Sequence, residues 1–383
     1  MRPLAERLDQ IIPSASMAMA QKALGKDNLG RRVIDLTWGQ PDFDTPEHIK
    51  EAAWEAVRSG KNGYTSSAGI PELRTAIADF HRSCYGVSYN PGTEILVTPG
   101  AKQGLMYLMQ ALVNPGDEVI LFEPCWLSYR DMILLNGGIP RFIPAGKGLS
   151  PDLSMLEKTV NKRTKAVLLN NPVNPTGYVF KRSELELIAD VAGRYDLYVI
   201  SDEIYDRIVF SAFISLSELK RIRGRLIIAN GFSKTYAMTG WRIGYLLGPE
   251  SVISRVSLIH QHTATCAAAP SQYAALAALR GNQDSVNNMV RTYKKRRDFM
   301  MEELKSTSFH IIPPDGTFYA MLDVSVLGVS PGENAEVLFK KCGIAVVDGI
   351  SYGESASSYV RLSLTKDKAE LSEAVERLKK FRK

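Results

Sequence analysis

The sequence has little cysteine, little histidine and no cluster of either. Its 383 residues include 5 histidines and 4 cysteines, the latter being Cys84, Cys125, Cys266 and Cys342. The cysteines are isolated, with neither a C-x-x-C pair nor a histidine at ligand spacing, so we expect no disulfide framework and a reducing, cytoplasmic location. His260 and His262 are two positions apart, which places them on different faces of a helix, and H-E-x-x-H is absent. We therefore expect no metal site.

Long apolar segments and a strong charge of one sign are also absent. No run approaches the roughly 18 apolar residues that a membrane helix requires, and the N-terminal "MRPLAERLDQIIP" lacks an apolar signal core. Lysine and arginine outnumber aspartate and glutamate by only 47 to 41, a net charge of +6. The densest basic run, "KKRR" at 294–297, is interpreted as a solvated helix face. We expect neither a membrane partner nor a nucleic-acid partner.

The sequence does contain a regular alternation of short apolar runs and helix-period segments, without a fixed internal repeat. "EILVT" at 94–98 predicts a buried strand, and the apolar stripe from Ala101 to Leu112 predicts a helix that opens at "PGAK". Further strands are predicted at "EVILFEP", "KAVLLNNP", "LYVISDE" and "RLIIAN". This α/β pattern predicts a mostly parallel sheet covered by helices on both faces, with its chemistry at the carboxyl ends of the strands.

The chain is predicted to divide into three parts. Residues 46–280 carry the α/β pattern and are expected to form a large domain. Residues 281–383 change to a charged helix at 287–305, short strands near "GTFYAML" and "AVVDG" and a final amphipathic helix, which predicts a smaller α+β domain. Residues 1–45 are too few to bury a core alone, so we expect this arm to pack on the small domain or to reach a partner chain.

Polar side chains follow three of the predicted strands. Asn174 lies in "NPVNPTG", Asp202 and Tyr205 lie in "SDEIY", and Lys234 lies in "GFSK". Because the carboxyl ends of parallel strands meet at one edge of a sheet, an amide, a carboxylate, a phenol and an amine converge there. Pyridoxal 5′-phosphate requires this set: the amine for its aldehyde, the carboxylate for its pyridine nitrogen, the phenol and amide for its ring oxygen. Arg242 and the backbone N–H groups of the helix start at 101–102 suit its phosphate.

Eight short motifs run in order through essentially the whole chain. They are "GQPDFDTP", "YTSSAGIPELR", "TPGAKQGL", "PGDEVI", "NPVNPTG", "SDEIY", "GFSKTYAMTGWRIGY" and "YVRLSL". Each is weak alone, but in this order they make the chain similar to the class I, fold-type I aminotransferases, in the prokaryotic-type aspartate aminotransferase branch. The resemblance implies an α/β fold, with a large domain whose mostly parallel sheet is flanked by helices and a smaller α+β domain. It also implies a ping-pong transfer of an amino group from an L-amino acid to a 2-oxo acid.

The resemblance implies a cofactor role for each matching residue. Lys234 is implied to bind the cofactor covalently, as the catalytic base, and Arg242 to anchor its phosphate. Trp126 in "PCWLSY" is implied to stack on the pyridine ring. Tyr64 in "NGYTSS" is implied to reach the phosphate of the neighbouring subunit, so a homodimer with shared sites is expected. The full cofactor set implied is Tyr64, Ala101, Lys102, Trp126, Asn174, Asp202, Tyr205, Ser233, Lys234 and Arg242.

The substrate contacts are implied in the same way. Gly39 and Arg361 match groups that hold the α-carboxylate, the arginine through a bidentate fork. Lys102 and Ser16 match positions that recognise a distal carboxylate, so aspartate or glutamate is the favoured donor. The full substrate-binding set implied is Ser16, Trp38, Gly39, Lys102, Asn174 and Arg361.

Other interpretations stay open. Trp38 is bulkier than the residue usual at its position, and Asp348 stands where proline is common, so both are expected to reshape the pocket for a larger or cationic donor. The same cofactor site supports carbon–sulfur β-lyases, decarboxylases and oxidases, because the surrounding groups decide the fate of the substrate carbanion. A cofactor-binding regulator would need a DNA-binding module, for which motifs that begin by Gly39 leave no N-terminal room. In isolation, Trp126 is more often a core side chain and Arg361 a surface ion pair.

Overall fold

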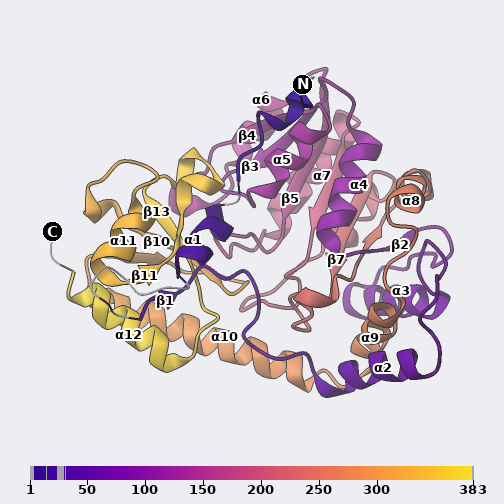
Figure 1. Cartoon of the computed structure of the whole chain (residues 1–383). Helices are drawn as coiled ribbons and strands as arrows, with labels where there is room; N and C mark the ends of the chain where they lie inside the picture. Colours follow the sequence, from indigo (N-terminus) through magenta and orange to yellow (C-terminus); the bar gives the residue numbers. More distant parts are fainter. Residues whose placement is uncertain (1–3, 14, 24–29, 31, 382–383) are drawn as a thin grey trace.

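The computed structural model describes residues 4–13, 15–23, 30 and 32–381, and Figure 1 shows their arrangement. A seven-stranded sheet forms the centre of the larger part, in the order β2-β8-β7-β6-β5-β3-β4. The strands are β2 (Ile95–Thr98), β3 (Glu118–Phe122), β4 (Ile139–Ile143), β5 (Thr164–Asn170), β6 (Tyr198–Asp202), β7 (Leu226–Gly231) and β8 (Gly244–Leu247). β8 is antiparallel to β2 and β7, and the other neighbours are parallel. The predicted mostly parallel sheet is confirmed.

Helices cover both faces of this sheet (Figure 1). One face packs on α4 (Ala101–Leu112), α5 (Ser128–Leu135) and α8 (Glu250–Thr263). The other packs on α2 (Glu47–Arg58), α3 (Pro71–Tyr85), α7 (Arg182–Arg194) and α9 (Ala269–Arg280). Within β3, Val119 and Leu121 belong to the first core and Ile120 and Phe122 to the second. Alternate side chains are therefore apolar on both faces, which explains why these strands read as continuous apolar runs.

A smaller part packs beside the large sheet. Its antiparallel sheet has the order β12-β13-β10-β9, formed by β9 (His310–Ile312), β10 (Tyr319–Asp323), β12 (Val347–Asp348) and β13 (Tyr359–Ser363). Its helices are α1 (Ala15–Ala23), α11 (Asn334–Cys342) and α12 (Lys368–Lys379). β1 (Ile34–Asp35) pairs in parallel with β11 (Ile344–Ala345), so the N-terminal arm joins the C-terminal part of the chain. The domain boundaries at residues 45 and 280 stay a prediction.

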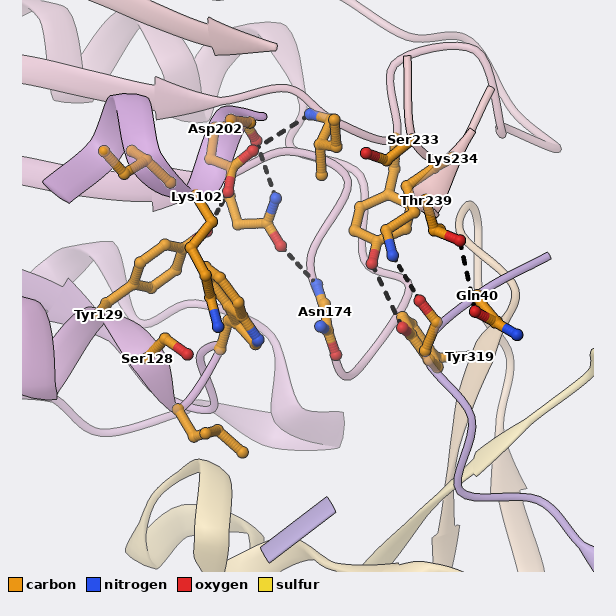
Figure 2. Close-up of a pocket in the computed structure, with 18 of the residues that line it drawn as sticks. Gln40, Lys102, Ser128, Tyr129, Asn174, Asp202, Ser233, Lys234, Thr239 and Tyr319 are labelled. Atoms are coloured by element: carbon orange, nitrogen blue, oxygen red, sulfur yellow. Dashed lines mark hydrogen bonds between the residues drawn. The ribbon is translucent and has the colours of Figure 1, made fainter. Parts of the chain in front are cut away.

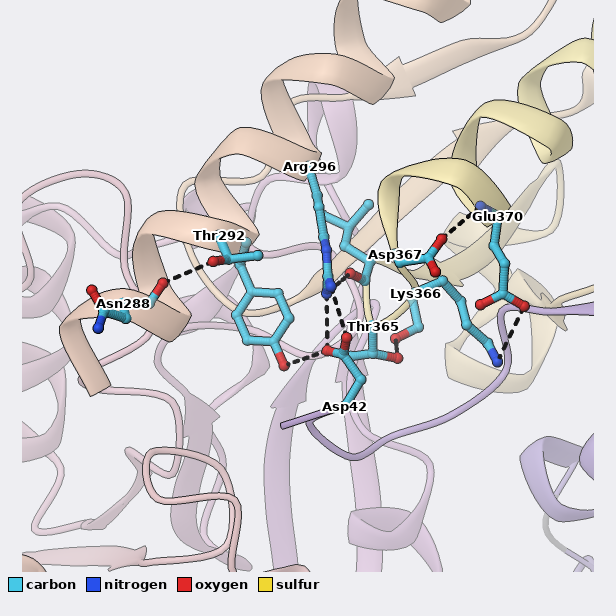
Figure 3. Close-up of polar contacts among 11 residues, drawn as sticks. Asp42, Asn288, Thr292, Arg296, Thr365, Lys366, Asp367 and Glu370 are labelled. Atoms are coloured by element: carbon cyan, nitrogen blue, oxygen red, sulfur yellow. Dashed lines mark hydrogen bonds and ion pairs between the residues drawn. The ribbon is translucent and has the colours of Figure 1, made fainter. Parts of the chain in front are cut away.

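The helix α10 (Asp284–Glu303) joins the two parts, running from beside α2 to beside α12 (Figure 1). Only half of its basic run forms the solvated face that we expected, because Lys294 and Lys295 are exposed whereas the two arginines are largely covered. Arg296, whose side chain is only 11% exposed, donates to both carboxylate oxygens of Asp42 at 2.9 and 2.7 Å (Figure 3). It also donates to the backbone carbonyl of Leu364 at 3.0 Å. A bidentate Arg–carboxylate pair of this kind fixes geometry, and here it attaches the C-terminal end of the arm to α10.

Neither a membrane segment nor a metal cluster occurs among the described residues. No helix in the described ranges combines the length and the apolarity that crossing a bilayer requires. The same residues contain no group of three or more His, Cys, Asp or Glu side chains placed to hold a metal ion.

Candidate active site

A cavity of about 440 Å³ lies at the carboxyl ends of β5, β6 and β7 (Figure 2). These strands end at Asn170, Asp202 and Gly231, so the residues that end or follow them line the cavity. The small part of the molecule contributes Tyr319 from β10 and Arg361 from β13 to the opposite wall. The volume falls within the roughly 300–1,000 Å³ typical of small-molecule and cofactor sites.

Most of the predicted site residues meet in this cavity. Those that line it are Trp38, Gly39, Ala101, Lys102, Trp126, Asn174, Asp202, Tyr205, Ser233, Lys234, Arg242 and Arg361. They come from segments as far apart as residues 38 and 361, so the fold rather than local sequence assembles them. The functional roles given to them by the motifs stay predictions at this point.

Three predicted positions lie elsewhere or are not described. Tyr64 is 89% exposed and does not line the cavity of its own chain. The side chain of Ser16 lies outside the described residues. Asp348 is not among the cavity-lining residues described, and its effect on the pocket stays a prediction; its carboxylate accepts from the backbone N–H of Ala335 at 3.2 Å, in the first turn of α11. A carboxylate that satisfies helix N–H groups is held at the start of that helix.

Lys234 carries the most perturbed amine of the cavity. It follows β7 by three positions, and its Nζ donates to the backbone carbonyl of Gly39 (Figure 2). Burial lowers the pKa of this amine to about 8, and the positive charges of Arg361 and Arg242 add to the effect. A lysine with a pKa near neutrality is neutral often enough to act as a nucleophile and as a base.

Asp202 is a buried carboxylate with a donor on each oxygen. The Tyr129 hydroxyl donates to its Oδ2 at 2.6 Å, and the backbone N–H of Ile204 donates to its Oδ1 at 3.2 Å. Burial raises the pKa of Asp202 to about 6, while the Tyr129 and Ile204 hydrogen bonds and the charge of Lys234 act in the opposite direction. The carboxyl group is thus mainly ionised at pH 7, which suits it to pair with a cationic ring nitrogen.

Arg361 is buried without a carboxylate partner among the described residues. Its Nη2 donates to the backbone carbonyl of Thr37 at 2.6 Å and its Nη1 to the side-chain oxygen of Asn174 at 3.3 Å. Its guanidinium carbon lies 4.3 Å from the centre of the Tyr319 ring. Its Nε is buried and has no hydrogen-bond partner in the described part of the chain. A buried, unneutralised guanidinium in the wall of the cavity is suited to a ligand carboxylate.

Arg242 and the start of α4 form an anion site. Arg242 adopts the left-handed conformation (φ 51°), which costs a non-glycine residue about 1–2 kcal/mol, and its Nη1 donates to the Thr239 carbonyl at 2.7 Å. A Cβ at Gly100 would lie 2.7 Å from Arg242 Nη2, so glycine allows the guanidinium to approach the helix start. With glycine as its N-cap, α4 receives no side-chain cap from the described residues. First-turn N–H groups and an arginine together suit a phosphate.

Lys102 lies at the exposed side of the cavity. Its Nζ is 4.8 Å from the centre of the Trp126 ring, a cation–π distance. Desolvation, and then the charge of Arg242, lowers the pKa of Lys102. The described residues that line the cavity include four cationic side chains and one carboxylate. The cations are Lys102, Lys234, Arg242 and Arg361, and the carboxylate is Asp202. This excess of positive charge suits a ligand with a phosphate and carboxylates.

The motifs missed several residues that line the cavity. Tyr129 lies three positions after Trp126, one helical turn away, and this spacing in "CWLSY" could have placed it on the same side. Tyr319 also lines the cavity, and its hydroxyl lies 3.3 Å from the hydroxyl of Tyr205. No local pattern in "GTFYAML" predicts this position. The remaining residues missed are Gln40, Leu105, Leu127, Ser128, Asn170, Ile204 and Thr239.

Comparison with known proteins shows the family. Residues 31–378 match the family described as aminotransferase class I and II. The aspartate/prephenate aminotransferase of Thermus thermophilus is 38% identical over 382 residues, covering 98% of each chain. The aromatic-amino-acid aminotransferase 2 of Thermococcus litoralis is 36% identical, covering 99% of this chain and 98% of that one. The solved structure of the aspartate aminotransferase from Thermus thermophilus with maleate has a TM-score of 0.92 at 38% identity, covering 98% of this chain and 99% of the other.

The chain belongs to the class I and II aminotransferases. It is therefore an amino-group transferase with pyridoxal phosphate as cofactor, and its fold is fold-type I, as the motifs predicted. The cavity fits this cofactor on its own terms: an amine of lowered pKa, an ionised buried carboxylate and an anion site line a single volume. The relatives and the solved structure named above are all described as aminotransferases, in agreement with the favoured prediction.

Proposed function

We propose that the enzyme transfers the amino group of an L-amino acid, preferably aspartate or glutamate, to a 2-oxo acid. The observation that carries this proposal is the surplus cation at the cavity mouth. Arg242 suits the cofactor phosphate, Arg361 suits the substrate α-carboxylate, and Lys234 suits the chemistry at Cα. Lys102 is the cationic side chain left over among the described lining residues, and a distal carboxylate would neutralise it.

The proposed roles follow from the contacts of each side chain. Pyridoxal phosphate, when bound, supplies an electron sink for the pair left on the substrate Cα. Lys234 would hold the cofactor covalently, and its neutral amine would serve as the general base and acid that moves the substrate Cα proton. Asp202 would pair with the pyridine N–H, and Tyr205 and Asn174 would donate to the ring oxygen. Trp126 covers the ring face.

The phosphate and carboxylate ends are assigned in the same way. Arg242, Ser233 and the N–H groups at 101–102 hold the phosphate, with the open first turn of α4 in support. Arg361, fixed by Thr37 and Asn174, would pair through its guanidinium with the α-carboxylate beside Gly39. In ping-pong turnover the donor and the acceptor bind in turn at the same site. The same contact with Arg361 can serve both, because each carries an α-carboxylate.

A second class of donor is proposed for the same cavity. The relative from Thermus thermophilus is named for aspartate and prephenate, and that from Thermococcus litoralis for aromatic amino acids. Trp38, Leu105, Trp126 and Leu127 add apolar surface to the cavity around Lys102. We therefore propose that aromatic donors are accepted less efficiently than acidic ones. A larger or cationic donor is the alternative that the bulk of Trp38 favours.

We also propose a homodimer with shared active sites. Tyr64 is 89% exposed. Four further large apolar residues are at least 50% exposed: Leu4, Leu8, Ile12 and Trp54. Leu4, Leu8 and Ile12 belong to one short segment of the N-terminal arm, and a group of large apolar side chains left exposed is typical of a surface that a partner covers. Tyr64 is proposed to complete the phosphate site of the partner. A cytoplasmic location is proposed from the isolated cysteines.

The experiment that tests this function is a donor panel. Purified enzyme with cofactor is incubated with acidic, aromatic, cationic and small neutral amino acids, each with and without 2-oxoglutarate, and oxo-acid formation is measured. We expect sustained turnover that depends on 2-oxoglutarate, with aspartate as the most efficient donor. Sustained oxo-acid formation without an acceptor would contradict transamination, and a preference for arginine or lysine would contradict the role of Lys102.

A further inference from the structure

Tyr129 touches two of the residues proposed to hold the cofactor ring, Asp202 and Trp126. It lies in the first turn of α5 (Ser128–Leu135) and is 1% exposed. Its hydroxyl donates to Oδ2 of Asp202 at 2.6 Å (Figure 2). Its ring stands edge-on to the indole of Trp126, with centroids 5.2 Å apart and an interplanar angle of 87°. Tyr129 thus contacts both Asp202, which is proposed to pair with the ring nitrogen, and Trp126, which is proposed to stack on the ring face.

The contacts of Asp202 explain why such a phenol matters. An ionised carboxylate that is buried needs donors, and Tyr129 and the Ile204 N–H supply one to each oxygen. A carboxylate has about four lone-pair sites, so a ring N–H is accommodated as a third donor. The other titratable groups of the described residues that face Asp202 are the Lys234 amine and the Tyr205 phenol. Burial raises the pKa of Tyr129 well above its usual range, so it stays protonated and keeps donating.

We propose that Tyr129 is a positioning residue for the cofactor: its hydroxyl orients the Asp202 carboxylate toward the ring nitrogen and favours its ionised form, while its ring edge sets the plane of Trp126. This inference rests on the proposed role of Asp202. The two contacts are separable, because Tyr129→Phe removes the donor and keeps the ring.

The fold supplies a matched control for the lost hydrogen bond. Tyr85 donates to Oδ2 of Asp206 at 2.6 Å, the same bond length and the same pair of groups. Asp206 is buried as Asp202 is, and Asn230 also donates to it, at 2.9 Å. Neither Tyr85 nor Asp206 is among the described residues that line the cavity. Tyr85→Phe therefore removes an equivalent phenol–carboxylate bond that lies outside the described lining of the cavity.

The test uses the full chain in five forms: wild type, Tyr129→Phe, Asp202→Asn, both substitutions together, and Tyr85→Phe. Two quantities are measured: the Kd of pyridoxal phosphate for cofactor-free protein, and the pH midpoint of the visible absorption band of the lysine-linked cofactor. We expect Tyr129→Phe to raise the Kd about tenfold or more, as for a hydrogen bond to a charged group. The band midpoint should shift to higher pH, because a ring nitrogen that is protonated less of the time withdraws less charge.

The double variant and the control decide the interpretation. Adding Tyr129→Phe to Asp202→Asn should change the Kd by no more than about twofold, since the bond is already altered. Tyr85→Phe should leave both quantities at their wild-type values. Equal losses in Tyr129→Phe and Tyr85→Phe, or full additivity in the double variant, would overturn the inference. If Asp202→Asn weakens binding but Tyr129→Phe does not, the inference about Tyr129 is wrong and the proposed function stands. If Asp202→Asn itself has no effect, the proposed role of Asp202 fails.

Discussion

The amine of Lys234 donates a hydrogen bond to the backbone carbonyl of Gly39, a residue 195 positions earlier in the chain. Lys234 follows β7 of the large sheet, whereas Gly39 follows β1, which pairs with β11 of the smaller part. A Cβ at Gly39 would lie 2.9 Å from the Tyr319 hydroxyl, so glycine at this position leaves room for the Tyr319 side chain. The reactive end of the lysine is thus in contact with the N-terminal arm.

Substitution of Lys102 and of Arg361 should have different effects on donor choice. A charge-assisted contact to a carboxylate contributes about 1.5–3 kcal/mol, so its loss should lower kcat/KM about ten- to a hundredfold. Lys102→Ala should lower it for aspartate and glutamate and spare alanine and aromatic donors. Arg361→Ala should lower it for every donor, because all carry an α-carboxylate. Steady-state kinetics with one acidic and one neutral donor separates the two.

The control in that experiment is the neutral donor. If Lys102→Ala lowers kcat/KM equally for both donors, the lysine serves the cofactor or the fold. The proposed preference for acidic donors would then lose its main support, whereas the conclusion that the protein is an aminotransferase would still hold.

Shared active sites predict complementation between two inactive variants. Tyr64→Ala and Lys234→Ala should each be severely impaired. In a mixed dimer, one of the two sites receives Tyr64 from one chain and Lys234 from the other, so activity should return to a fraction of wild type after mixing. Subunit exchange is verified in parallel with differently tagged chains. Exchange without recovery of activity would argue that Tyr64 does not act across subunits.

Buried Glu203 should make stability depend on pH. Its carboxyl group accepts from Ser215 Oγ at 2.8 Å and from Ser201 Oγ at 2.9 Å, and burial raises its pKa to about 8. Because this pKa exceeds that of the unfolded chain, about 4.3, the stability contributed by the protonated acid is complete below pH 4.3 and is lost as the pH rises through about 8. Glu203→Gln, which mimics the protonated acid, should therefore gain stability relative to wild type across this window.

The measurement is urea unfolding at pH 5, 7 and 8.5. The gain in the free energy of unfolding should grow with pH to the order of a few kcal/mol. Glu47→Gln, at an exposed glutamate, should show no such trend. A difference between Glu203→Gln and wild type that is constant over this range would count against the assigned pKa.

The sequence predicted the centre of the molecule well, for a physical reason. Strands buried on both faces are continuous apolar runs, and those expected around Val119, Val167, Val199 and Ile228 all occur in the large sheet. Since parallel strands end at one edge, residues that follow them, such as Asp202 and Lys234, were expected to converge, and they line one cavity.

The sequence could not predict contacts that depend on how elements pack. Tyr319 lines the cavity only because β10 of the smaller sheet faces the large one. Arg296 was expected in solvent, but the segment containing Asp42 folds back on α10 and pairs with it. The contact of Asp348 with the start of α11 was not expected either. Each outcome depends on a neighbour more than 10 residues away, which local patterns do not encode.

The most direct test of the account is the identity of the lysine that binds the cofactor. The holoenzyme is reduced with borohydride, digested, and the labelled peptide is mapped by mass spectrometry, with Lys234→Ala and Lys102→Ala as comparison variants. We predict a single label, on Lys234. The Lys234→Ala variant should have neither the label nor turnover, and the Lys102→Ala variant should keep the label on Lys234. A label on any other lysine, or turnover in Lys234→Ala comparable to wild type, would contradict the account.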